Sequence, residues 1–141
     1  MTMHIEARVD NARNAHQATV ATNGLARDIA IPPRSTGSGS SANGGELLCL
    51  ALATCYCNDV YREAAMRRIE VSRVVVHVHA DFGASGEPAA GLRYRADVSA
   101  NATEPDIRAL MLHTDRVAEI QNTLRRGIAV DFAIGDIVAS A

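Results

Sequence analysis

Three cysteines are the most reactive side chains in this sequence, and Cys49, Cys55 and Cys57 all fall in one short apolar stretch. An α-helix turns by about 100° and rises by about 1.5 Å per residue. On one helix Cys55 would therefore point away from the other two thiols, and Cys49 and Cys57 would lie about 12 Å apart along the axis. Because a disulfide needs Cα atoms within about 7 Å, no pair can form one, and the three thiols alone hold no zinc ion.

A reactive cysteine needs a lowered thiol pKa, provided by a cation or a helix N-terminus, and access to a substrate. Cys55 lies in the middle of the expected helix, so the cation would come from elsewhere in the chain. All 14 basic side chains are arginines. Schiff-base chemistry and lysine-dependent phosphate loops are therefore excluded. For Cys49 we favour a buried structural role.

Histidines offer a metal site as an alternative. His77 and His79 lie on one face of an expected strand, and with His113 they could form a three-histidine site. We favour the simpler interpretation of solvent-exposed strand histidines, and we expect no metal and no cofactor. The sequence also contains no serine elbow and no glycine-rich phosphate-binding fingerprint.

Composition limits the class of protein. The chain has 141 residues, 48% of them hydrophobic and 21% charged, which predicts one soluble domain over residues 1–141. The net charge of −2 gives no support for binding to nucleic acid or to a membrane surface. No signal peptide is visible, and the longest apolar run, residues 47–57, is too short to span a membrane. We expect a cytoplasmic protein.

The elements that must position Cys55 follow from periodicity and turn residues. Asn23-Gly24 predicts a hairpin between strands 17–22 and 25–31, followed by a loop rich in proline, glycine and serine. A helix is expected from Glu46 to about Arg68. Its second half should turn four residues inward: Val60, Tyr61, Ala64 and Ala65.

The second half of the chain shows further alternation. Strands over 69–82 and 92–100 should form a second hairpin. A helix is expected from an N-cap at Thr103 to Gly127, and a last strand over 128–138. Adjacent hairpins predict antiparallel sheets and an α+β fold.

The run from Gly44 to Cys55, GGELLCLALATC, resembles the central-helix signature of the OsmC/Ohr family, the osmotically inducible and organic-hydroperoxide-resistance proteins. In that family the stretch PEELLLAALAAC ends in the reactive cysteine. Residues 118–124, AEIQNTL, resemble the family's CPVSNTL, and the likeness covers nearly the whole chain. It implies an OsmC-like fold, with antiparallel sheets wrapped around a long central helix in an intertwined homodimer, and active sites at the subunit interface.

The resemblance also implies a chemistry. Cys55 would attack a peroxide as a thiolate, release an alcohol and become a sulfenic acid. Arg13 is the nearest candidate for the arginine that the family supplies from its N-terminal hairpin. Glu46 is the candidate for the glutamate that orients this arginine, one place after the family's position, which is Gly45 here. Ala118 replaces the resolving cysteine, so the chain is a divergent member that needs an external thiol.

Two hypotheses follow. The first is a redox protein of the oxidative stress response, a thiol peroxidase that reduces organic hydroperoxides or peroxide through Cys55 with an unidentified thiol reductant. The alternative is a catalytically degenerate OsmC-like dimer that binds a small ligand or a partner in the interface cleft. An arginine within about 4 Å of the Cys55 sulfur would favour the first.

Overall fold

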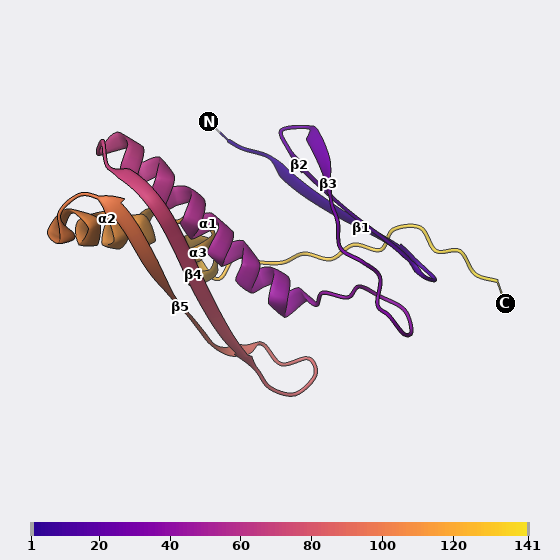
Figure 1. Ribbon diagram of the computed structural model, residues 1–141. Helices are drawn as coiled ribbons and strands as arrows, with labels where there is room; N and C mark the ends of the chain where they lie inside the picture. Colours follow the sequence, from indigo (N-terminus) through magenta and orange to yellow (C-terminus); the bar gives the residue numbers. More distant parts are fainter. Residues whose placement is uncertain (1, 141) are drawn as a thin grey trace. The chain divides into compact units, whose positions relative to one another are not determined.

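The computed structural model describes residues 2–140, and the chain divides into two compact units, residues 1–50 and 51–141. The first unit contains an antiparallel sheet with the order β1 (Ile5–Ala12), β2 (Ala15–Thr22), β3 (Leu25–Ile29) (Figure 1). Asn23 and Gly24 join β2 to β3, and both have positive φ values, as this tight turn requires. The hairpin predicted from Asn23-Gly24 is therefore confirmed.

Helix α1 (Gly44–Met66) begins with a reciprocal pair of capping hydrogen bonds. The amide of Glu46 donates to Asn43 Oδ1 at 2.8 Å, and the amide of Asn43 donates to Glu46 Oε1 at 2.9 Å. This capping box satisfies two amides at the start of the helix. At the other end Arg68 adopts a positive φ of 56°, and the amide of Ile69 turns back to the carbonyl of Ala64 at 2.9 Å.

The second unit packs α1 and helix α2 (Glu104–Val117) on a two-stranded antiparallel sheet, β4 (Glu70–Phe82) and β5 (Ala89–Asn101). Tyr56, Val60 and Ala64 from α1 meet Leu110 from α2 in one buried cluster. Apolar side chains of the segment 69–98 pack against this cluster: Ile69, Val71, Val74, Val76, Tyr94, Ala96 and Val98. Alternation along β4 and β5 thus predicted the strands correctly.

The buried face of α1 differs from the predicted one. Val60 and Ala64 are buried as expected, but Tyr61 and Ala65 are exposed. Asp59 and Glu63 are buried instead, each at 5% exposure. Their positions follow the i, i+4, i+7 spacing of one helical stripe, so geometry selects them although they carry charge. The prediction for Tyr61 and Ala65 was wrong.

The single helix predicted over 103–127 is interrupted. Thr103 caps α2 and Gly127 ends the second piece with φ 64°, as expected, but buried Ala118 is extended and separates α2 from helix α3 (Glu119–Arg126). Two side chains of α3 take over carbonyls at the end of α2. Asn122 Nδ2 donates to the Arg116 carbonyl at 2.9 Å, and Arg125 Nη1 donates to the Asp115 carbonyl at 3.2 Å.

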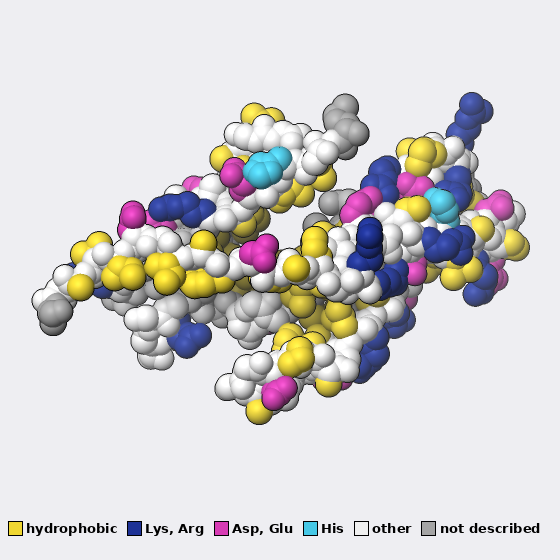
Figure 2. All heavy atoms as spheres, turned by 180° about the vertical axis from the view of Figure 1, so that it is seen from behind, with side chains coloured by type: hydrophobic (Ala, Val, Ile, Leu, Met, Phe, Trp, Pro, Cys, Tyr) yellow, Lys and Arg dark blue, Asp and Glu magenta, His cyan; other side chains and the backbone are white. Residues whose placement is uncertain are grey.

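The strand predicted over 128–138 is absent, because this segment is extended but pairs with no strand among the described residues. Its large apolar side chains are widely exposed, and they alternate from residue 128 to residue 134: Ile128, Val130, Phe132, Ile134, Ile137 and Val138. Figure 2 shows apolar side chains in a row along the extended segment at the left of the view. Alternation gives the segment one apolar face, but a strand also needs a neighbouring backbone.

The α+β class, with two antiparallel sheets and a long helix, is confirmed. The prediction of one domain over residues 1–141 stays a prediction. Among the helices described here, none combines the length and the apolar character that crossing a membrane would require.

The core of the second unit yields a stability prediction. Leu110 is fully buried in the cluster, whereas Leu112 on the same helix is 57% exposed. Leu110→Ala should lower the free energy of unfolding by about 2–5 kcal/mol because it leaves a cavity. Leu112→Ala is the matched control and should change it by no more than about 0.5 kcal/mol. Urea unfolding followed by circular dichroism measures both, and equal effects would contradict this assignment of the core.

Candidate functional site

The thiol of Cys55 lies where α1 meets the start of α3, and the side chain is half-buried and free. Its Sγ donates a hydrogen bond to Asp59 Oδ2 at 3.5 Å and lies 3.9 Å from Glu119 Oε1. Asp59 follows Cys55 by four residues, so both occupy the same face of α1. Two carboxyl groups therefore flank the sulfur, one from each helix.

Arg62 joins these acidic groups. Its Nη1 lies 3.1 Å from Asp59 Oδ1 and 3.0 Å from Glu119 Oε2, and its Nε lies 2.9 Å from Glu63 Oε2. The side chains of Asp59 and Glu63 are only 8% and 6% exposed. Buried carboxylates are stable only when paired and hydrogen-bonded, and Arg62 provides the pairing for both.

A histidine completes the pairing of Glu63. His113 from α2 places Nε2 2.8 Å from Glu63 Oε1, and Arg67 Nη1 lies 3.9 Å from the same oxygen. The hydrogen bond from Arg62 keeps the pKa of Glu63 below its usual value, against the effect of burial. Glu63 therefore connects α1 to α2, as Arg62 connects α1 to α3.

The surroundings of Cys55 favour the neutral thiol. Burial raises its pKa, and the negative charges of Asp59 and Glu119 raise it further, while the backbone N–H of Ile120 opposes them. This is the reverse of the lowered pKa that the sequence predicts for a reactive cysteine.

The two carboxyl groups near the sulfur differ from each other. Burial and the hydrogen bond with Glu119 raise the pKa of Asp59, although the charge of Arg62 lowers it. Burial raises the pKa of Glu119, but its hydrogen bonds with Asp59 and Arg62 bring this pKa below the usual value.

The cluster has the residue types of a metal site but the contacts of an ion pair. Cys55, Asp59 and Glu119 each present a ligand-type atom, and the three atoms lie within 4.8 Å of one another. Arg62 already occupies an oxygen of both carboxyl groups and supplies the positive charge. We therefore interpret this set as an ion-paired cluster.

The three-histidine alternative does not assemble. His113 contacts Glu63, whereas His77 and His79 are exposed on β4, opposite Arg95 and Arg93 of β5. All three cysteines are free thiols in this structure.

The other predicted site residues have local contacts of their own. The carboxylate of Glu46 caps α1, and Arg13 forms the β1–β2 turn with φ 54°. Their proposed action on Cys55 stays a prediction. Sequence reasoning missed Asp59, Arg62 and Glu119. The i+4 and i+7 spacing of Asp59 and Arg62 from Cys55 could have revealed the first two.

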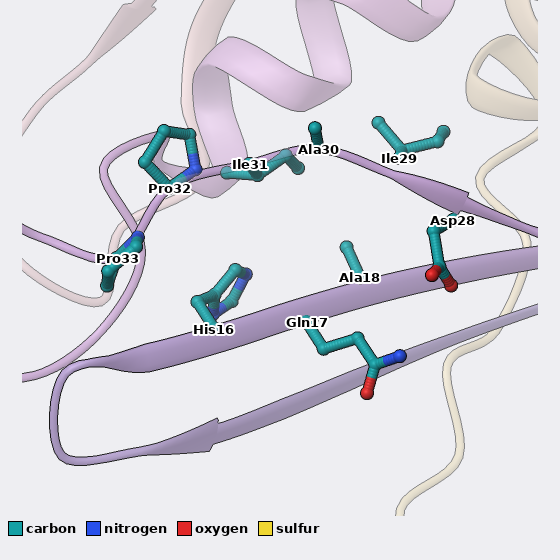
Figure 3. Close-up of a pocket in the computed structure, with 9 residues that line it drawn as sticks. All are labelled: His16, Gln17, Ala18, Asp28, Ile29, Ala30, Ile31, Pro32 and Pro33. Carbon is teal, nitrogen blue, oxygen red and sulfur yellow. The ribbon is translucent and has the colours of Figure 1, made fainter.

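A separate pocket lies within the first unit. Its volume is about 450 Å³, and it is lined by residues 16–18 and 28–33. Figure 3 shows His16 and Ala18 pointing from β2 toward the segment 30–32, whereas Gln17 points away. The ring nitrogen Nδ1 of His16 is hydrogen-bonded to Asn11 Nδ2 at 3.0 Å, and no thiol lines the pocket.

Several solved structures share the fold of this chain. An OsmC-like protein from Mycoplasma pneumoniae is 15% identical with a TM-score of 0.60, over 89% of this chain and 88% of the other. An OsmC-like protein of unknown function from Vibrio cholerae is 15% identical with a TM-score of 0.54, over 87% and 93%. An OsmC-like hydroperoxide resistance protein from Jannaschia sp. CCS1 is 14% identical with a TM-score of 0.54, over 96% of both chains.

The similarity of these structures concerns the fold, since all three are less than 25% identical to this chain. Comparison with curated proteins gave no match. The family model described as OsmC-like protein matches residues 37–133, which include α1, both strands of the second sheet, α2 and α3. The chain therefore belongs to the OsmC-like protein family.

Proposed function

We propose that this protein is a thiol-dependent redox protein that reduces organic hydroperoxides or hydrogen peroxide through Cys55. The main observation is the position of Cys55, a free and half-buried thiol at the meeting of α1 and α3, with a hydrogen-bond acceptor at 3.5 Å. Membership of the OsmC-like family supports this role. So does the name of the Jannaschia structure, which is called a hydroperoxide resistance protein.

The proposed cycle has two steps. The sulfur of Cys55 attacks one peroxide oxygen, the O–O bond breaks, and the products are a sulfenic acid and an alcohol, or water when the substrate is hydrogen peroxide. Because Ala118 stands at the resolving position, two external thiols then return the sulfenic acid to the thiol and form a disulfide and water. Sulfur is oxidised by two electrons in the first step and reduced by two in the second.

Arg13 and Glu46 remain proposed contributors to this site. A cation close to the sulfur would offset the two carboxyl groups that raise the pKa of Cys55. We also keep the proposal of a single cytoplasmic domain that acts on small-molecule peroxides with an external thiol reductant, without nucleic acid or membrane as a partner.

A homodimer is the second part of the proposal. The C-terminal segment exposes a row of apolar side chains, and Phe132 at 91% is typical of them. A contiguous row of exposed apolar side chains is typical of an interaction site. A second copy of the chain that pairs with this segment would supply the backbone partners of the strand predicted there.

One observation favours the alternative, a degenerate member that binds a small ligand. Gln121 is 2% exposed, and its Oε1 has no hydrogen-bond partner among the described residues. The side chain lines a cavity of about 220 Å³ that Tyr94 and Arg125 also line. A ligand with a hydrogen-bond donor would satisfy this oxygen. In that case Cys55 should stay reduced in excess peroxide.

The first functional prediction concerns the reacting thiol. One equivalent of cumene hydroperoxide should consume the Cys55 thiol and give a sulfenic acid that dimedone traps, as measured by intact mass. Cys55→Ser should abolish peroxide consumption, whereas Cys57→Ser, the matched control on the same helix, should retain it because Cys57 faces another side of α1. Unmodified Cys55 at excess peroxide would reject the proposal.

The second functional prediction concerns the pH dependence of Cys55 alkylation. Because burial and nearby acids raise the pKa of Cys55, its thiolate fraction at pH 7 should be smaller than that of an ordinary cysteine. Alkylation of Cys55 by iodoacetamide should therefore increase with pH, with a midpoint above the usual ~8.5. A midpoint below that value would show that another cation acts on the sulfur.

The third concerns assembly. Light scattering with size exclusion should give a mass near twice the 15.0 kDa of one chain. Phe132→Asp places a charge in the apolar row and should shift the protein toward the monomer. Asp131→Asn changes charge at the neighbouring position, which faces the other way in a strand, and should leave the dimer intact. A monomeric wild-type protein at micromolar concentration would contradict the dimer.

A further inference from the structure

Reduction of a hydroperoxide needs a proton as well as an electron pair. When the O–O bond breaks, the departing oxygen would leave as a strongly basic alkoxide unless it is protonated in the same step. Cys55 reacts as a nucleophile only after losing its own proton. Both proton movements occur within a few ångströms of the sulfur, where the structure places Asp59 Oδ2 at 3.5 Å.

We propose that Asp59 is a catalytic proton relay, which takes the proton of the Cys55 thiol and delivers it to the leaving oxygen of the hydroperoxide. This inference rests on the proposed peroxidase function and extends it. The S–O bond forms as the O–O bond breaks, sulfur loses two electrons, and the peroxide gains them. The thiol proton leaves in the alcohol, so the step needs no proton from solvent.

The two oxygens of Asp59 have different partners. Oδ1 lies 3.1 Å from Arg62 Nη1, and this pair holds the carboxyl group in place. Oδ2 accepts the hydrogen bond of Cys55, so it is the oxygen that would take up the thiol proton. Because Cys55 and Asp59 are one helical turn apart, the distance between them is fixed by α1 itself.

Glu119 is less suited to the relay. Its nearest oxygen to the sulfur is 3.9 Å away, and both of its oxygens already accept from Arg62, at 3.4 and 3.0 Å. The side chain is 57% exposed, so water competes for its proton. Glu119 acts instead on Asp59, because it raises the pKa of that carboxyl group.

The charged groups around Asp59 support proton exchange. Helix α1 contributes the Cys55 thiol, the Arg62 guanidinium and, on the far side of Arg62, Glu63. Helix α3 contributes Glu119. His113 of α2 reaches Glu63 and not Asp59. Burial and Glu119 together raise the pKa of Asp59, which brings a proton carrier closer to the pH at which it works.

Two variants separate the relay from simple electrostatics. Asp59→Asn and Glu119→Gln each remove one carboxyl group beside the Cys55 sulfur, and both should increase the rate of alkylation by iodoacetamide, whose iodide leaves without a proton. With cumene hydroperoxide they should diverge. Asp59→Asn should lose about 100-fold in the second-order rate of Cys55 oxidation, within the range of general acid–base catalysis, whereas Glu119→Gln should lose much less, because Glu119 acts on the reaction only through Asp59.

The leaving group provides a further readout that a structural role would not move. Peracetic acid expels acetate, which needs no proton, so Asp59→Asn should react with it at close to the wild-type rate. An equal loss with both oxidants, or no loss with cumene hydroperoxide, would overturn the relay. Circular dichroism confirms that each variant is folded.

The test holds even if Asp59→Asn does not fold. In the wild-type protein the relay predicts that oxidation of Cys55 depends less on the basicity of the leaving group than oxidation of a cysteine peptide, and an equal dependence overturns it. The two proposals fail differently. Wild-type Cys55 that resists cumene hydroperoxide rejects the peroxidase function itself, whereas normal wild-type oxidation with unchanged Asp59→Asn rejects only the relay.

Discussion

The rest of this site depends on the ion pairs that the guanidinium of Arg62 forms. It contacts Asp59 and Glu63 on its own helix and Glu119 on α3. Two of these acids are almost completely buried, and a buried carboxylate without a partner is strongly unfavourable. Arg62 thus permits the buried stripe of α1 to contain charge, and it holds the start of α3 beside Cys55.

This arrangement determines what kind of thiol Cys55 is. In most reactive sites a cation acts on the sulfur and lowers its pKa. Here Arg62 pairs with the carboxyl groups beside the sulfur, and burial together with these acids raises the pKa of the thiol. The raised pKa leaves little Cys55 thiolate before the reaction. An acceptor that removes the thiol proton during the attack would therefore increase the reaction rate of Cys55 more than a small population of thiolate does.

The break between α2 and α3 brings the second helix to the thiol. Ala118 is fully buried and extended, and the chain resumes as helix at Glu119, so the Ile120 amide and the Glu119 carboxylate both approach Cys55. Asn122 holds the end of α2, and Gln121 donates to the Leu52 carbonyl of α1 at 3.1 Å. The family-like run 118–124 thus serves as the joint between three helices.

The sequence determined the local elements, because each depends on nearby residues. Asn23-Gly24 specifies a turn, Thr103 and Gly127 mark helix ends, and the run that ends at Cys55 identifies the family. Contacts between distant residues were decided only by the tertiary structure. The approach of Glu119 to Cys55 spans 64 positions, and no helical period encodes it. Apolar periodicity also pointed away from Asp59 and Glu63, because it scores charge as exposed, and only the packing of α1 against α2, α3 and the sheet shows that Arg62 and His113 make their burial possible.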